Sequence, residues 1–83
     1  MFYTYILRSQ KSGRFYIGHT SDLDERLNYH NQGRVKATKN KGPWEYVYYE
    51  TFENKLLANQ RELEIKNKKS RKYINFLIEN KRE

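Results

Sequence analysis

Two tyrosines near the start of the chain could supply phenol groups to one site. Tyr5 lies in a strand-like segment from Phe2 to Ser9, and Tyr16 lies in a second such segment that begins with Phe15. Residues 11–13, Lys-Ser-Gly, are typical of a turn, so the two segments predict a β-hairpin. A single strand tyrosine is better explained by core or rim packing. The two phenols therefore indicate a functional site only if other polar residues lie beside them.

An arginine and a histidine share the stripe of a predicted helix that should face the sheet. The stripe has the spacing i, i+3, i+4, i+7 and consists of Leu23, Arg26, Leu27 and His30. Because Arg26 and His30 are one turn apart, both side chains could bind one anion in a cleft. Two simpler interpretations stay open. Arg26 could pair with Asp22, and His30 could be a helix-end residue that the helix dipole favours.

A carboxylate interrupts the apolar stripe of a later predicted helix, where Ala58, Glu62 and Ile65 have the spacing i, i+4, i+7. Burial of Glu62 without a partner would be costly, so it needs a cation, which could be Arg26, a lysine or a metal ion. The simpler alternative is a surface Glu62 that pairs along the helix with Lys66. Phenols beside an arginine, a histidine and a glutamate form a residue set suited to metal-dependent phosphodiester cleavage.

The charge of the chain favours a polyanionic partner. Seventeen Lys and Arg against ten Asp and Glu give a net charge of +7, and counterion release then favours nucleic acid. Ordinary solubility charge on a small domain is the alternative. Two stretches without acidic residues hold much of the positive charge. The first contains Arg34, Lys36, Lys39 and Lys41, and the second contains Lys66, Lys68, Lys69, Arg71 and Lys72.

Turn and cap signals predict the elements that must position these residues. The predicted strands are residues 2–9, a segment beginning at 15–17, and 44–52, and the predicted helices are residues 23–32, 55–68 and 71–80. Ser21 or Asp22 can cap the first helix, Gly33 can stop it, and Ser70 can cap the last. Gly18 either ends the second strand or lets another group approach closely, and the basic segment after the first helix is predicted as loop.

The order strand, strand, helix, strand, helix, helix predicts an α+β fold with a three-stranded antiparallel sheet packed by helices. A chain of 83 residues allows one small domain, residues 1–83.

The absence of cysteine excludes disulfides, thiolate metal sites and cysteine nucleophiles, and favours a reducing compartment. No apolar run approaches the roughly 20 residues that span a bilayer, and strand-like sequence from Phe2 leaves no room for a signal peptide. We therefore expect a cytoplasmic protein without a membrane partner, and fraying only at residues 81–83.

The chain resembles the GIY-YIG nuclease superfamily over nearly its whole length. The second signature motif is intact as Tyr16-Ile17-Gly18, whereas the first reads Tyr3-Thr4-Tyr5 and keeps only its final tyrosine at the expected spacing. The family's conserved arginine, histidine and glutamate correspond to Arg26, His30 and the glutamate of Arg61-Glu62. Two further segments look most like the small bacterial members and the nuclease domain of a eukaryotic structure-selective endonuclease subunit, namely His30-Asn31-x-Gly33 and Pro43-Trp44-Glu45.

This resemblance implies hydrolysis of phosphodiester bonds with the help of a divalent metal ion. Glu62 would hold one Mg²⁺ or Mn²⁺, with water and a phosphate oxygen completing the shell. A phenolate of Tyr5, with Tyr16 beside it, would take the proton from the attacking water. The positive charge of Arg26 would help the phenolate form and would bind the phosphate.

The resemblance also implies roles for the two histidines. His30 would hydrogen-bond the tyrosine or the phosphate, and His19 is a further candidate for general base or orienting residue. Spacing alone does not choose between Tyr5, Tyr16 and His19 as the proton acceptor.

The two basic stretches would contact backbone phosphates without reading bases, so sequence specificity should be low. We therefore expect a DNA endonuclease that selects branched, flapped or nicked structures, as in repair or recombination. The alternative is a nucleic-acid-binding module with little or no turnover, because the first motif is altered and no targeting domain is fused. An RNA substrate, a protein partner and a homodimer stay open.

Overall fold

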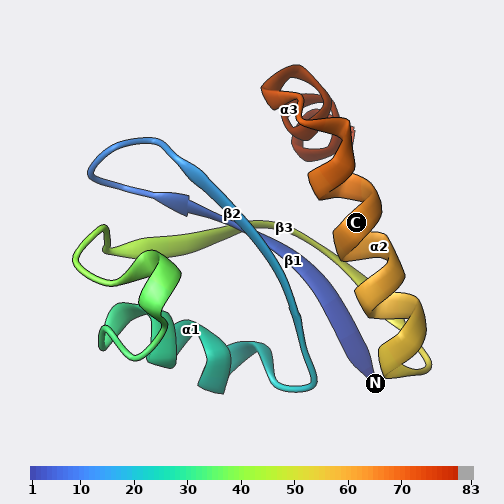
Figure 1. Cartoon of the computed structure of the whole chain (residues 1–83), viewed down its shortest axis with the longest axis horizontal. Helices are drawn as coiled ribbons and strands as arrows, with labels where there is room; N and C mark the ends of the chain where they lie inside the picture. Colours follow the sequence, from blue (N-terminus) through green and yellow to red (C-terminus); the bar gives the residue numbers. More distant parts are fainter. Residues whose placement is uncertain (81–83) are drawn as a thin grey trace.

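A three-stranded antiparallel sheet lies between two groups of helices (Figure 1). The computed structural model describes residues 1–80, so the fraying expected at residues 81–83 lies outside the described residues. The strands are β1 (Phe2–Ser9), β2 (Phe15–Thr20) and β3 (Trp44–Phe52). The helices are α1 (Leu23–Asn31), the short 3₁₀ helix η1 (Lys36–Thr38), α2 (Lys55–Lys68) and α3 (Arg71–Glu79). The predicted α+β class and the predicted order of strands and α-helices are confirmed.

β1 is the central strand in the order β2-β1-β3, which explains why residues 4–7 at its middle are completely buried. β2 pairs with β1 so that Tyr5 lies opposite Gly18 and Leu7 lies opposite Tyr16. β2 is an outer strand, and its second edge pairs with no other strand in the part of the chain that the structure describes. Side chains on both faces of β2 can therefore be reached from this edge.

Alternation along β1 directs its side chains into two separate cores. The first core contains Tyr5, Leu7 and Trp44, with Leu23 and Leu27 of α1 packed against it. The second core contains Ile6, Ile65 of α2, and Ile74 and Leu77 of α3. Figure 1 shows the same division, with α1 on one side of the twisted sheet and α2 and α3 on the other. No helix within residues 1–80 is long and apolar enough to cross a membrane.

Short polar side chains set the helix starts. Asp22, rather than Ser21, caps α1, Ser70 caps α3 as predicted, and Asn54 caps α2. Both α1 and α3 end one residue before their predicted ends, because Gln32 and Asn80 are C-cap residues that follow the last helical turn. The helix boundaries are otherwise as the cap signals predict.

The structure decides between the two interpretations of Gly18 and corrects the prediction for the basic segment. β2 continues through Gly18 to Thr20, so the glycine permits a close approach and does not end the strand. The basic segment predicted as loop contains η1, because the backbone N–H of Thr38 donates to the carbonyl of Val35 at 3.1 Å. Thr38 is also buried. The loop-like composition of this segment gives no sign of the 3₁₀ helix or of that burial.

The end of α1 is tied to the start of β3 by a pair of reciprocal hydrogen bonds. The backbone N–H of Trp44 donates to Asn31 Oδ1 at 2.7 Å, and Asn31 Nδ2 donates to the Trp44 carbonyl at 3.2 Å. The two motif segments that look like the small bacterial GIY-YIG members therefore bind each other. The segment between them is closed into a loop whose ends are fixed.

An arginine fixes α2 to the sheet. Arg61 binds the carboxylate of Glu50 on β3, with Nη2 at 2.9 Å from Oε2 and Nε at 3.1 Å from both oxygens. Its Nη1 donates to Tyr73 Oη of α3 at 3.2 Å and to Glu64. The side chains of Arg61 and Glu50 are only 19% and 25% exposed. This network therefore connects α2 to both β3 and α3.

We predict that Arg61→Ala lowers the free energy of unfolding by about 1–3 kcal/mol, because the half-buried Glu50 carboxylate loses its charged partner. Urea denaturation followed by circular dichroism measures this change. Arg8→Ala is the matched control. Arg8 pairs with Glu45 at 3.6 Å with both side chains largely exposed, and such pairs contribute about 0–1 kcal/mol. Equal losses in the two variants would contradict the importance of the Arg61 network.

Candidate active site

The phenol of Tyr5 is completely buried on the face of the sheet that α1 covers. Gly18 lies opposite it on β2. A β-carbon at Gly18 would lie 2.5 Å from Oη and 2.7 Å from Cζ of Tyr5, which is too close for any real contact. The missing side chain therefore makes the space in which the Tyr5 hydroxyl reaches its partners on α1.

Two residues of α1 bind the Tyr5 hydroxyl. Arg26 Nε donates to Oη at 3.3 Å, and His30 Nε2 lies 2.9 Å from Oη. The two α1 residues thus share one face of the helix and one partner, as their spacing predicts. His30 does lie in the last turn of α1, as the simpler interpretation has it, but its side chain is 2% exposed and binds Tyr5. The side chain of Arg26 turns to Tyr5, and Asp22 instead caps the helix.

Two more tyrosines enclose this group of side chains. The Tyr16 ring lies 5.0 Å from the His30 ring, and the Tyr46 ring lies 5.4 Å from the Tyr5 ring, both in edge-to-face geometry. Tyr46 also donates its hydroxyl to the carbonyl of Leu23 at 2.6 Å. We call Tyr5, Tyr16, Arg26 and His30 the phenol cluster. Tyr46 was not among the predicted site residues, since nothing distinguishes it from the other tyrosines of β3 in the sequence.

Burial raises the pKa of Tyr5 to about 12. The hydrogen bond and the charge of Arg26 lower this pKa, as expected, but they do not outweigh burial, and Tyr16 and Glu62 raise it further. Tyr5 is therefore a neutral phenol at neutral pH unless more positive charge comes close. Arg26 alone does not produce the phenolate that the resemblance implies.

Burial lowers the pKa of His30 to about 4, and the positive charge of Arg26 acts in the same direction. The imidazole is therefore neutral at neutral pH, with one ring nitrogen as donor and the other as acceptor. Its second nitrogen, Nδ1, lies 2.7 Å from the hydroxyl oxygen of Thr38. Thr38 was not predicted, because a single threonine among basic loop residues carries no signal in the sequence.

On the other face of the sheet, Glu62 binds His19 and Lys66, and we call these three residues the carboxylate cluster. Glu62 Oε1 lies 2.5 Å from His19 Nδ1, and Oε2 accepts from Lys66 Nζ at 2.6 Å. The Glu62 side chain is 12% exposed and lies between the buried Ala58 and Ile65, as the stripe predicts. The pairing with Lys66 is thus present as the simpler interpretation predicts, but the carboxylate is largely buried and does not lie on the surface.

The two clusters lie on opposite faces of β2 and meet around its outer edge. Gly18 and His19 are consecutive strand residues, so they face opposite sides of the sheet. Lys66 connects the sides, since its ammonium binds Glu62 and lies 5.9 Å from the centre of the Tyr16 ring. The six predicted catalytic candidates therefore divide between the two faces of the sheet, four in the phenol cluster and two in the carboxylate cluster.

The carboxylate cluster can hold a cation. The ammonium of Lys66 binds Oε2, so this carboxylate oxygen is already the ligand of one cation, and a metal ion would have to replace that ammonium. Within residues 1–80, no three His, Cys, Asp or Glu side chains gather to hold a metal ion. An ion here would take one carboxylate, from Glu62, with water or phosphate oxygens as its other ligands, which suits Mg²⁺. The residues present fit such an ion, because the Lys66 side chain is 42% exposed and can move away.

The residues predicted to contact phosphates lie on two surfaces. The first set surrounds η1 just beyond the end of α1, and it consists of Arg34, Lys36, Lys39 and Lys41. The second set lies at the junction of α2 and α3, and it consists of Lys66, Lys68, Lys69, Arg71 and Lys72. Three of these side chains already bind protein groups. Lys66 binds Glu62, Arg71 donates to the Gly13 carbonyl at 3.1 Å, and Lys41 donates to the Ala37 carbonyl at 3.4 Å.

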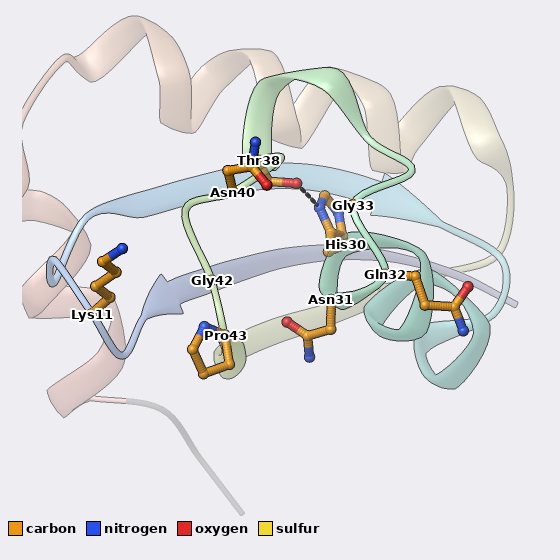
Figure 2. A pocket seen from close by; sticks show the side chains of 9 residues that line it. All are labelled: Lys11, His30, Asn31, Gln32, Gly33, Thr38, Asn40, Gly42 and Pro43. Carbon is orange, nitrogen blue, oxygen red and sulfur yellow. Dashed lines mark hydrogen bonds between the residues drawn. The ribbon is translucent and has the colours of Figure 1, made fainter.

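A pocket of about 540 Å³ separates the η1 segment from the turn between β1 and β2 (Figure 2). His30 and Thr38 line one side of it, and Lys11 extends from the turn on the other. Lys11 was predicted only as a turn residue. It adds a positive charge across the pocket from the η1 segment, next to the phenol cluster.

The family model of the GIY-YIG catalytic domain matches residues 1–75. The chain belongs to the GIY-YIG family. It is 45% identical over 67 residues to the UPF0213 protein CPE1444 of Clostridium perfringens, a match that covers 80% of this chain and 71% of that protein. It is 37% identical over 78 residues to the UPF0213 protein SSP2268 of Staphylococcus saprophyticus, covering 93% and 94% of the two chains.

The solution NMR structure of the UPF0213 protein BH0048 from Bacillus halodurans is similar to this GIY-YIG chain, with a TM-score of 0.61 and 35% identity. The match covers 98% of this chain and 86% of that one. The predicted resemblance to small bacterial GIY-YIG proteins is thus confirmed. Membership implies a nuclease domain, and GIY-YIG nucleases generally use divalent metal ions.

We predict that the free energy of unfolding falls as the pH drops from about 6.5 toward 4, in part because of His30. In this window the unfolded chain protonates this histidine and the folded protein does not. One such group changes the stability by up to about 1.4 kcal/mol per pH unit.

Urea denaturation of the wild type and of His30→Gln between about pH 7 and pH 5 isolates this contribution, because all other titrating groups are shared. The stability advantage of the wild type should shrink as the pH falls. An advantage that stays constant would contradict a neutral, buried His30.

Proposed function

We propose that this GIY-YIG protein is a divalent-metal-dependent endonuclease that hydrolyses DNA phosphodiester bonds with low sequence specificity. The observation that carries the proposal is the buried Tyr5 hydroxyl bound to both Arg26 and His30, next to the outer edge of β2 where Glu62 lies on the opposite face. A buried packing tyrosine needs only one hydrogen-bond partner, as Tyr46 has in the Leu23 carbonyl, whereas the Tyr5 hydroxyl binds a guanidinium and an imidazole together. We also propose that the activity belongs to one domain, residues 1–83, in the cytoplasm.

In this mechanism Tyr5 accepts the proton of the attacking water, and Arg26 binds the phosphate. Because Arg26 uses Nε for Tyr5, its two terminal nitrogens can donate to phosphate oxygens in the paired geometry of a guanidinium. These bonds strengthen as negative charge develops on the phosphate. Tyr16 would stand beside the reacting group, and His30 would hold the Tyr5 hydroxyl in place.

Glu62 would hold Mg²⁺ or Mn²⁺, and His19 would orient the carboxylate through Oε1. When bound, the ion would supply Lewis-acid stabilisation of the phosphate and positive charge near the phenol. Lys66 would release Oε2 and become available for a phosphate. The raised pKa of Tyr5 makes this extra positive charge necessary for its work as a base.

The basic residues around η1 and at the α2–α3 junction would bind backbone phosphates. Lys11 extends the first of these surfaces across the pocket beside His30. Contacts of this kind carry no base information, so selection would rest on DNA shape, as at branches, flaps or nicks in repair or recombination. DNA is the proposed substrate, and a protein partner or a second copy of the chain could add selectivity.

A nucleic-acid-binding module with little turnover is the second candidate, and two observations favour it. Both oxygens of Glu62 are engaged by His19 and Lys66, and burial keeps Tyr5 protonated. If Lys66 does not leave Glu62, the fold would still bind DNA without cleaving it. Cleavage assays with and without metal separate the two functions.

We predict metal-dependent cleavage that Glu62→Gln and Arg26→Ala each reduce by about 10²-fold or more, as expected when a preorganised charge-stabilising group is lost. Labelled duplex, single-stranded and branched DNA are incubated with Mg²⁺, Mn²⁺ or EDTA, and products are resolved on denaturing gels. Single-turnover rates separate chemistry from DNA binding.

Glu53→Gln and Arg8→Ala are the matched controls, because they remove the same charges from exposed positions. Both controls should cleave at the wild-type rate. Equal rates in the controls and the site variants would place the chemistry elsewhere. Tight binding of DNA by the wild type without cleavage in either metal would support the binding module.

We predict that DNA affinity falls about 10³-fold between roughly 50 mM and 200 mM salt if about six phosphates are contacted. Fluorescence anisotropy at several salt concentrations measures the slope. The double variant Lys39→Gln/Lys41→Gln should reduce the slope by about two, since each lysine that contacts a phosphate contributes about one. If the salt slope of the double variant equals that of the wild type, the η1 surface is not part of the DNA interface.

A further inference from the structure

Thr38 lies where the basic η1 segment folds beneath the phenol cluster, and no role has yet been given to its hydroxyl. The residue is 1% exposed. Its hydroxyl oxygen lies 2.7 Å from His30 Nδ1, a bond drawn in Figure 2, and donates to the Val35 carbonyl at 3.3 Å. The indole Nε1 of Trp44 donates to the Thr38 carbonyl at 3.2 Å, so the backbone of Thr38 is held as well.

Thr38 is the fourth member of a line of hydrogen bonds that begins at Arg26. The line continues through the Tyr5 hydroxyl and the His30 imidazole to Thr38, and it ends at Val35. The direction of both end bonds is determined by chemistry. A guanidinium can only donate, and a backbone carbonyl can only accept.

The fixed ends determine the direction of the two bonds between them. Tyr5 Oη accepts from Arg26, so its single proton must go to its other partner, Nε2 of His30. A neutral imidazole that accepts at Nε2 carries its proton on Nδ1 and donates it to Thr38. The hydroxyl proton of Thr38 is then available for Val35.

The opposite direction leaves a buried donor without a partner. If Thr38 donated to Nδ1, then Nε2 would carry the proton and donate to Tyr5. The Tyr5 oxygen would accept from both Arg26 and His30, and its own proton would lack an acceptor among the bonds of this completely buried side chain. Such an unsatisfied donor costs about 1–3 kcal/mol.

We propose that Thr38 is a positioning residue that holds His30 in the Nδ1–H tautomer, so that Nε2 accepts the hydrogen bond of the Tyr5 hydroxyl. The importance of this arrangement for catalysis rests on the proposed nuclease function. With its proton turned toward His30, Tyr5 leaves its lone pairs for Arg26 and for the reacting group. In the proposed mechanism Nε2 would take this hydroxyl proton as the phenol oxygen takes the proton of the attacking water, so the phenol never carries two protons.

The first test needs only the wild-type protein, uniformly labelled with ¹⁵N. Long-range ¹H–¹⁵N correlation spectra at neutral pH distinguish a protonated ring nitrogen from an unprotonated one. We expect Nδ1 of His30 to be protonated and Nε2 to be unprotonated. The reverse assignment would overturn the proposal, whether or not the protein cleaves DNA.

The second test compares Thr38→Val, which keeps the shape and removes the hydroxyl, with Thr38→Ser, which keeps the hydroxyl. Thr38→Val should give a mixture of His30 tautomers and lower the single-turnover cleavage rate by about 10–100-fold, the scale for groups that orient a functional histidine. DNA affinity should not change. Thr38→Ser should restore both the tautomer and the rate, and the exposed Thr51→Val should leave both unchanged.

The outcomes separate the inference from the proposed function. A wild type that shows the expected tautomer but never cleaves DNA would support the hydrogen-bond assignment and contradict the nuclease proposal. A Thr38→Val protein that keeps both the wild-type tautomer and the wild-type rate would overturn the role of Thr38. If Thr38→Val does not fold, the wild-type spectrum and Thr38→Ser still decide the tautomer.

Discussion

A buried phenol hydroxyl must find its hydrogen-bond partners within the protein, and this constraint organises one whole side of the molecule. The hydroxyl of Tyr5 lies on the central strand, and Gly18 gives its ring the space it needs. Its partners, Arg26 and His30, determine which face of α1 packs on the sheet. His30 in turn needs Thr38, so the basic segment must also fold inward.

The elements of this fold could be predicted because their signals are local. Alternating apolar residues indicated the strands, Ser70 and Asp22 ended up as caps, and the stripe of α1 placed Arg26 and His30 on one face. Thr38 could not be predicted in the same way. Its burial depends on contacts with residues from α1 and β3, and its neighbours in the chain, Ala37 and Lys39, are exposed.

The arrangement of the candidate site was also only partly predictable. Helix spacing explained why Glu62 lies on a mostly buried stripe, but spacing does not tell which face of the sheet a helix covers. The structure puts Glu62 and Tyr5 on opposite faces of the sheet, and each lies against the outer strand β2, Glu62 at His19 and the completely buried Tyr5 at Gly18. This depends on strand order, which is a property of the whole fold.

Tyr5 and Gly18 belong to different strands, yet their sizes are complementary because they lie opposite each other in register. A methyl group added at position 18 would occupy the volume of the phenol oxygen. Alanine at position 18 would therefore be tolerated best together with a shorter side chain at position 5. That pair of substitutions would lose the Tyr5 hydroxyl. The two positions form a single design unit, so neither can be redesigned on its own.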